Sequence, residues 1–214
     1  MPRPEIVVLA GTNGAGKSSV AGRALRAQGA DYFNADEVTR SLLNNDASLS
    51  PQEANSRAWY KGRDMLRESI ASRQSFRFET TLGGNSIRDL LLKAANVGIA
   101  VRVFYVALES PELHIERVQA RVDRGGHHIP EDKIRARYDR SRQNLVQLLP
   151  HIAELRLYDN SKPVERGSAP TPLHILHVRS GRIDFLCPLH QVPGWAKPVV
   201  QRALELFGGG ESGG

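Results

Sequence analysis

The sequence GTNGAGKS occupies residues 11–18 and decides the fold of this 214-residue chain. It matches the phosphate-binding loop pattern, in which a glycine and four variable residues precede Gly-Lys-Ser. An apolar run at residues 5–10 comes directly before it, and residues 17–28 have helical character. Because a strand, a loop and a helix follow one another in this order, the segment indicates phosphate binding rather than an ordinary glycine-rich turn.

The chemistry of phosphate binding explains the parts of this loop. Gly14 and Gly16 let the backbone approach the phosphates, and successive N–H groups form an anion-binding nest. Lys17 reaches the β- and γ-phosphates, and the Ser18 hydroxyl binds Mg²⁺. The expected cofactors are therefore ATP or GTP and Mg²⁺. The predicted nucleotide-binding residues in this segment are Gly11, Thr12, Asn13, Gly14, Ala15, Gly16, Lys17, Ser18 and Ser19.

Strands and helices alternate through residue 158, which predicts an α/β fold with an open parallel sheet and flanking helices, as in P-loop NTPases and kinases. One of the helices is an arginine-bearing lid. A β-hairpin and a helix follow as an antiparallel addition. The predicted strands are residues 5–10, 31–34, 76–80, 100–108, 153–158, 173–178 and 183–186. The predicted helices are residues 17–28, 36–44, 51–73, 86–96, 111–124, 131–149 and 196–207.

Length and composition favour a single kinase domain over residues 1–207. Hydrophobic residues make up 40% of the chain and charged residues 24%, which excludes a fibrous or generally disordered protein. The lid region is expected at about residues 111–150, the C-terminal hairpin and helix at 171–207, and a disordered glycine-rich tail at 208–214.

The single cysteine and the absence of long apolar runs indicate the cellular compartment of the protein. Cys187 cannot form an internal disulfide, which fits a reducing cytosol. No apolar run approaches the roughly 18 residues of a membrane span. We therefore expect a cytoplasmic protein without a membrane partner.

Two carboxylates lie where strands end, at the edge of an open parallel sheet that binds ligands. Asp36 follows the predicted strand 31–34 and is the candidate base that orients an acceptor hydroxyl and accepts its proton. The alternative for Asp36 is a helix N-cap. Glu79 ends the strand at 76–80 and could contact the acceptor or a Mg²⁺-bound water, with a solvated edge residue as the alternative. Thr80 and Thr81 add hydroxyls for the acceptor.

The net charge of +6 is concentrated in one window. Residues 117–142 hold eight basic and four acidic residues. At about 100° per residue, Arg117, Arg121 and Arg124 fall within about 60° of one another on a helix. We predict that these three arginines are catalytic and neutralise charge on the transferred phosphoryl group, as a lid over the triphosphate. The alternative is a solvated basic face.

Four segments in this order resemble the zeta-toxin family of P-loop kinases, especially its short stand-alone members. They are residues 11–19, 33–36, 78–82 and 116–145, and the resemblance covers about residues 5–160. It implies an ATP- or GTP-dependent kinase. In the better-known members the acceptor is UDP-N-acetylglucosamine, phosphorylated on the 3′-hydroxyl of the amino sugar, and the product blocks cell-wall synthesis.

The resemblance also implies roles for single residues. Lys17 and Ser18 would hold the nucleotide and Mg²⁺, Asp36 would be the base, Glu79 would contact the acceptor sugar and Arg117 would grip the phosphates. Residues 158–161, with Asn160 among the nucleotide-binding residues, would lie near the adenine. Residues 126–130 depart from the family because histidine stands where a second lid arginine is expected. Arg121 or Arg124 would substitute for it, and His127 is assigned to the acceptor.

Other functions fit parts of the same pattern. A related kinase could act on an antibiotic or a nucleoside. A nucleic-acid end kinase is disfavoured because the basic window contains a single aromatic residue, Tyr138, for base stacking. A nucleotide-dependent interaction protein would need no acceptor. A toxin would also need an antitoxin as its partner.

Overall fold

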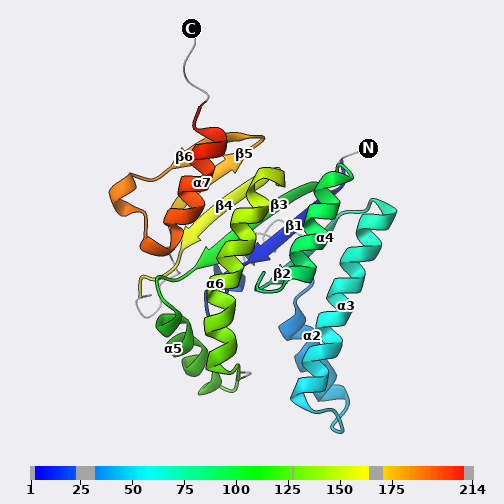
Figure 1. Cartoon of the computed structure of the whole chain (residues 1–214). Helices are drawn as coiled ribbons and strands as arrows, with labels where there is room; N and C mark the ends of the chain where they lie inside the picture. The colour runs from blue at the N-terminus through cyan, green and yellow to red at the C-terminus, as the bar shows by residue number, and fades with distance from the viewer. Residues whose placement is uncertain (1–2, 23–31, 127, 164–170, 210–214) are drawn as a thin grey trace.

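The computed structural model describes residues 3–22, 32–126, 128–163 and 171–209. A six-stranded sheet runs through the molecule in the order β2-β1-β3-β4-β5-β6 (Figure 1). The first four strands are parallel, and β5 and β6 are antiparallel additions, which confirms the predicted fold class. The strands are β1 (Glu5–Ala10), β2 (Phe76–Thr80), β3 (Ala100–Ala107), β4 (Glu154–Asp159), β5 (Leu173–Arg179) and β6 (Arg182–Leu186).

The central strand β1 determines where the site lies. All of its residues except Glu5 are buried, as expected of a parallel strand covered on both faces. Its last residue, Ala10, pairs with Thr80 of β2 and Tyr105 of β3. The carboxyl ends of three neighbouring strands therefore meet at the edge where the phosphate loop begins.

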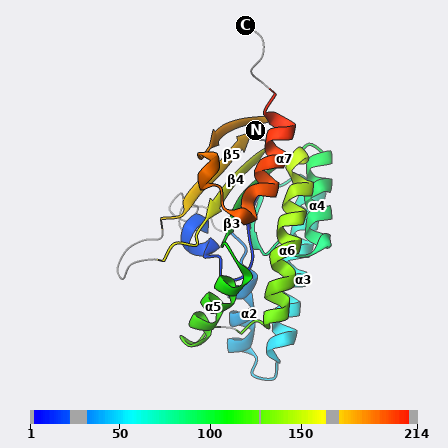
Figure 2. The ribbon, with the colours of Figure 1, turned by 60° about the vertical axis from the view of Figure 1, so that its left-hand side comes forward.

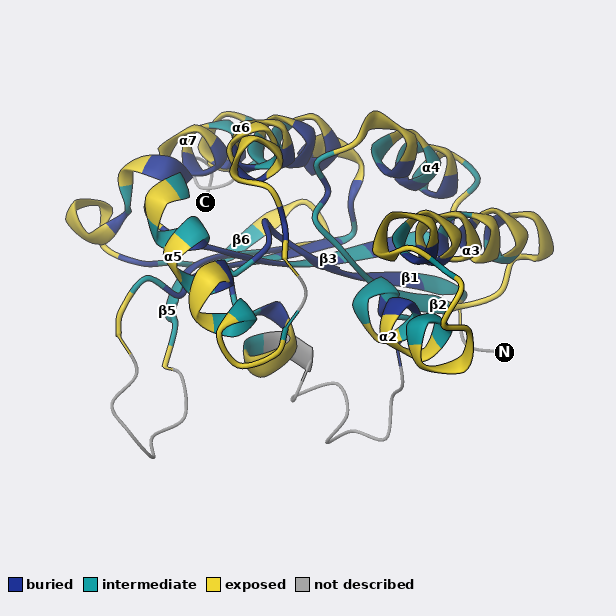
Figure 3. Cartoon of the chain, turned by 90° about the horizontal axis from the view of Figure 1, so that it is seen from below, coloured by how far each residue is buried: buried dark blue, intermediate teal, exposed yellow. Residues whose placement is uncertain are grey.

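Helices cover the sheet unequally. Helices α3, α4, α6 and α7 lie side by side over one face, whereas α2 and α5 lie at the carboxyl end of the strands (Figures 1, 2 and 3). None of the described helices is both long enough and apolar enough to span a membrane. The helices are α2 (Ala35–Asn45), α3 (Pro51–Ser72), α4 (Asn85–Asn96), α5 (Pro111–Val122), α6 (Glu131–Leu148) and α7 (Lys197–Phe207).

The main core lies between the sheet and this helical layer. Alternate residues of the strands, such as Val8 and Val103, face fully buried helical side chains such as Leu66 and Leu145. The start of α3 shows how local sequence places a helix in this layer. Ser50 and Glu53 form the predicted capping box, which satisfies two backbone N–H groups at the helix N-terminus.

Two predicted elements differ from the sequence expectation. The predicted strand at 31–34 is wrong in its described part, because Phe33 forms only an isolated parallel bridge with Phe78 at the sheet edge. Asn34 then caps α2, so the chain turns into a helix after one bridge. The predicted helix at 17–28 is described only as far as Gly22, as the π-helical turn η1 (Ser18–Gly22). Asp31, residues 23–28 and most of the expected tail, residues 210–214, lie outside the described residues.

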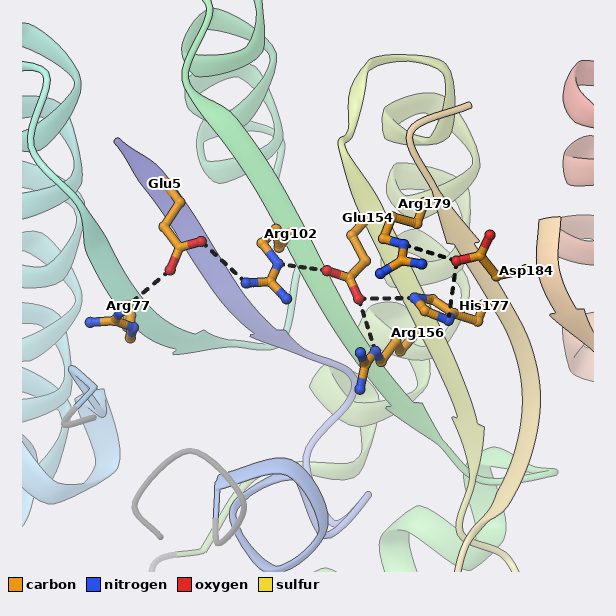
Figure 4. Close-up of polar contacts among 8 residues, drawn as sticks. All are labelled: Glu5, Arg77, Arg102, Glu154, Arg156, His177, Arg179 and Asp184. Carbon is orange, nitrogen blue, oxygen red and sulfur yellow. Dashed lines mark hydrogen bonds and ion pairs between the residues drawn. The ribbon is translucent and has the colours of Figure 1, made fainter. Parts of the chain in front are cut away.

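The face of the sheet opposite the helical layer carries a row of charged side chains, which we call the charge row (Figure 4). Ion pairs connect β2 to β1, β1 to β3, β3 to β4, β4 to β5 and β5 to β6. The charge row consists of Glu5, Arg77, Arg102, Glu154, Arg156, His177, Arg179 and Asp184.

Glu154 is the buried centre of the charge row. Its carboxylate accepts hydrogen bonds from Arg102 Nε at 2.6 Å and Arg156 Nε at 2.9 Å, and lies 2.9 Å from His177 Nε2. Burial alone would raise the pKa of Glu154, but these partners together hold that pKa below its usual value. The folded state therefore favours the ionised carboxylate.

Glu154→Gln is expected to destabilise the protein by about 2 kcal/mol at neutral pH. The loss is moderate because the arginines are partly exposed and keep water contacts when the carboxylate is removed. Since the pKa of Glu154 is lowered in the folded state, the greater stability of the wild type is fully present above the ordinary glutamate pKa. It disappears as the pH falls through the folded pKa. Urea unfolding of both proteins over an acidic pH series measures this.

Glu205→Gln is the matched control for this prediction. Glu205 pairs with Arg202 on the exposed side of α7, so the control should change stability by less than about 1 kcal/mol. An equal effect of the two substitutions would show that the charge row adds no more than a surface ion pair.

Candidate active site

The phosphate loop, residues 11–18, leaves the end of β1 and leads into η1. Gly16 has φ of 81°, and a Cβ atom there would lie 2.6 Å from Nδ2 of Asn160. Asn160 follows β4 directly and donates from the same Nδ2 to the Ala15 carbonyl at 3.0 Å. The buried Asn160 therefore holds the loop backbone from the neighbouring strand end, which places this predicted nucleotide-binding residue beside the loop.

Lys17 and Ser18 meet Glu79 at the end of β2. The buried Lys17 ammonium lies 3.4 Å from Glu79 Oε1, and the Ser18 hydroxyl donates to Glu79 Oε2 at 2.7 Å. Asn34 also reaches Oε2, at 3.4 Å. The structure thus places Glu79 beside the phosphate and metal end of the loop.

The pair of Ser18 and Glu79 fits a magnesium ion. Both supply hard oxygen donors, which Mg²⁺ prefers. Their oxygens lie 2.7 Å apart, close to the roughly 2.9 Å between neighbouring ligands of an octahedral Mg²⁺ shell. Glu79 is therefore suited to bind the ion or one of its water molecules, the role considered for it beside acceptor contact.

Asp36 lies in the first turn of α2 with its carboxylate available for chemistry. The N-cap is Asn34, whose side chain accepts from the Asp36 N–H at 2.9 Å, so the capping alternative for Asp36 is not adopted. Asp36 Oδ2 instead lies 3.5 Å from Arg121 Nη1 of α5. This contact brings the candidate base to the lid helix.

The three predicted lid arginines have different partners. Arg117 donates to the backbone carbonyls of Ser161 and Lys162, at 3.1 and 3.3 Å, and so lies near the expected adenine region. Arg121 reaches Asp36. Arg124 lies two residues beyond the end of α5, so the predicted helix 111–124 is too long, and its exposed side chain donates to the Ala120 carbonyl at 2.8 Å. The opposite face of α5 packs as expected, with Val118 buried against residues of α6 and the segment before it.

The phosphate-loop residue Asn13 is held from both lid-region helices. His114 of α5 contacts the Asn13 carbonyl through Nδ1 at 2.7 Å. Arg137 of α6 donates from Nη1 to Asn13 Oδ1 at 2.8 Å. Neither residue is among the site residues predicted from the sequence. A signal for Arg137 was available, since it lies one turn after the inward-facing Ile134 and next to Tyr138.

His114 is neutral in the folded protein. Its side chain is fully buried, and this desolvation is the main reason that its pKa falls to about 4, with the charges of Lys17 and Arg117 acting in the same direction. The hydrogen bond to the Asn13 carbonyl opposes the shift but is outweighed. The neutral ring therefore donates its Nδ1–H to that carbonyl.

Acidification from about pH 7.5 to 4.5 is expected to destabilise the wild type by about 2.5 kcal/mol through His114 alone. In this range the unfolded chain takes up a proton near the ordinary histidine pKa of 6.5, whereas the folded chain does so only near 4. His114→Asn removes this proton uptake but retains a donor for Asn13. Urea unfolding at the two pH values should therefore show a smaller pH dependence for the variant.

His190→Asn changes an exposed histidine and is the control. It should retain the pH dependence of the wild type. Identical losses of stability in His114→Asn and the wild type would contradict the assignment of a neutral His114.

The remaining predicted acceptor residues lie around the end of β2. Thr80 is the last residue of β2, and its hydroxyl oxygen accepts from the Leu82 N–H at 3.1 Å. Thr81 is half-buried in the following loop. His127 lies outside the described residues.

These features define a P-loop domain with a kinase-like fold, in which the nucleotide-binding loop and two carboxylates share one edge of a parallel sheet. The chain belongs to the AAA domain family (AAA_33), whose model matches residues 6–148. A protein of Haemophilus influenzae, described only as uncharacterized, is 31% identical over 137 residues. These cover 62% of this chain and 91% of that protein.

Solved structures with low sequence identity share the fold. A chain from the complex of AvrRxo1-ORF1 and ORF2 with ATP has a TM-score of 0.66 at 16% identity. The match covers 94% of this chain and 64% of that one, so this chain spans less than two thirds of it. A chain of the PezAT toxin–antitoxin system of Streptococcus pneumoniae has a TM-score of 0.55 at 15% identity, covering 74% and 68%.

Proposed function

We propose that the protein is a kinase that transfers the γ-phosphoryl group of ATP or GTP to a hydroxyl group of a small molecule. The observation that carries the proposal is the placement of one carboxylate on the phosphate loop and a second beside the lid helix. Glu79 contacts Lys17 and Ser18, while Asp36 lies beside Arg121 of the lid helix. A P-loop kinase needs both a metal-side carboxylate and an acceptor-side base.

The nucleotide side of the proposed reaction uses the loop itself. The backbone N–H groups and Lys17 bind the phosphates, and Arg117 lies beside the nucleotide. Ser18 and Glu79 would hold Mg²⁺, which when bound neutralises charge on the β- and γ-phosphates. Asn160 keeps the loop backbone in place through the Ala15 carbonyl.

The acceptor side uses Asp36. The acceptor hydroxyl oxygen forms a bond to the γ-phosphorus as the bond from this phosphorus to the bridging oxygen of the β-phosphate breaks. The hydroxyl proton passes to the Asp36 carboxylate. Arg121 lies 3.5 Å from the Asp36 carboxylate and offers positive charge to the transferred group.

We take UDP-N-acetylglucosamine as the first acceptor to test. The zeta-toxin resemblance supports it, as does the fold shared with a chain of a toxin–antitoxin system. The same observations support an antitoxin-like partner protein, because both structural relatives come from two-component assemblies.

Phosphoryl transfer tests the proposal directly. The protein is incubated with ATP or GTP, Mg²⁺ and UDP-N-acetylglucosamine, and mass spectrometry is used to search for the phosphorylated sugar nucleotide. Lys17→Ala should abolish the product, whereas Lys93→Ala, an exposed lysine of α4, should not. Nucleotide binding without transfer to this sugar or to a panel of other hydroxyl compounds would overturn the kinase assignment.

A further inference from the structure

Arg137 differs from its neighbours in how its charge is satisfied. Arg121 and Arg135 each pair with a carboxylate, of Asp36 and Glu112, and Arg142 pairs with Asp139. Within the described ranges, Arg137 forms no ion pair, and its recorded hydrogen bond goes to the neutral amide of Asn13.

The side chain of Arg137 is half-buried. Its side chain passes directly over Gly83, where a Cβ atom would lie 2.8 Å from Arg137 Cγ. Burial lowers the pKa of its guanidinium, and the negative charge of Asp36 only partly opposes this. A half-buried cation without a paired anion has lost part of its hydration without gaining an ion pair, so this position suits a group that binds an anionic ligand.

The position of the guanidinium indicates where that anion lies. Arg137 contacts the phosphate loop at Asn13. The negative charge of Asp36, the proposed base, acts on the Arg137 guanidinium and raises its pKa. The guanidinium therefore lies near both the phosphate loop and the proposed base. The planar guanidinium suits phosphate oxygens, which it can bind through two N–H groups.

We propose that Arg137 is a phosphate-binding residue of the active site, supplied by α6 rather than by the lid helix. The phosphate is either the γ-phosphate of the nucleotide or a phosphate group on the acceptor. This inference rests on the proposed function. It adds a third arginine to that reaction beside Arg117 and Arg121. The predicted Arg124, in contrast, lies beyond the end of α5, is exposed and donates to the Ala120 carbonyl.

Nucleotide titration separates the two sources of the phosphate. For Arg137→Gln, calorimetric titration with ATP and with ADP should show ATP affinity lowered about 10- to 100-fold and ADP affinity lowered much less, if the γ-phosphate is bound. If instead the acceptor phosphate is bound, both nucleotide affinities stay within about two-fold. In that case the KM for UDP-N-acetylglucosamine rises about 10- to 100-fold.

Two further variants control this experiment. Arg140→Gln makes the same change at an exposed position on the same helix and should leave all three constants unchanged. Arg137→Lys keeps the charge but not the planar fork, and should lie between the wild type and Arg137→Gln.

A purely structural Arg137 would give a different result. The proposal would be overturned if Arg137→Gln lost ATP and ADP affinity equally and also melted at a lower temperature. It would likewise be overturned if neither nucleotide affinity nor the acceptor KM changed. If the wild type phosphorylates no acceptor, the comparison of ATP with ADP decides alone. A lost preference for ATP would then support Arg137 although the proposed kinase activity has failed.

Discussion

Asp36→Asn is expected to lower the rate of phosphoryl transfer by about 10² to 10⁴-fold, because an amide cannot accept the proton of the acceptor hydroxyl. Nucleotide affinity should stay within about two-fold. The Asp36 carboxylate contacts Arg121, and the Asp36 backbone is bonded to the side chains of Asn34 and Arg40. In the described part of the chain, none of these partners is a phosphate-loop residue. Single-turnover transfer and calorimetric titration with ATP measure the two quantities in the same preparation.

The control for this prediction is Asp64→Asn. Asp64 is exposed on α3 and pairs with Arg63, so its amide should leave both transfer and nucleotide binding unchanged. If Asp36→Asn transferred phosphate at a rate within ten-fold of the wild type, another group would have to accept the proton. The assignment of Asp36 as the base would then be wrong.

Gly11→Ala is expected to lower the free energy of unfolding by about 4 kcal/mol. Gly11 has φ of 134°, and a Cβ atom there would lie 1.9 Å from the carbonyl oxygen of Val106. Both residues belong to the central strands or to their continuation, so neither backbone moves without disturbing the sheet. The expected fall in melting temperature is about 8–16 °C.

Gly84→Ala makes the same change where nothing lies within 4 Å of the added atom and φ is −113°. It should change stability by less than about 1 kcal/mol. A melting temperature of Gly11→Ala within about 2 °C of the wild type would show that the start of the loop can rearrange.

The fold was largely predictable because its signals are local. The phosphate loop follows a short apolar strand, and parallel strands alternate with helices that carry their own caps, as at Ser50. The short segment ending at Asn34 was not predictable in this way. Its single bridge to Phe78 depends on a neighbouring strand, and the amide of Asn34 favours a helix cap over a longer strand.

The candidate site was predictable only in part. The position of Glu79 at a strand end follows from topology, but its contact with Ser18 depends on the register between β1 and β2. The helical wheel places Arg117, Arg121 and Arg124 on one face. In the structure, however, Arg117 reaches the segment after β4, Arg121 reaches Asp36 of α2, and Arg124 lies beyond the end of α5. The contacts of Asn13 with His114 and Arg137 join residues about a hundred positions apart.

The charge row has a consequence for folding. Because successive side chains of a strand point to opposite faces, a shift of one residue along any strand would carry a charge such as Glu154 into the apolar layer beneath the helices. The same shift would expose a core residue such as Leu155. Misaligned sheets would thus bury unpaired charges, and the row favours the native alignment over these competitors during assembly.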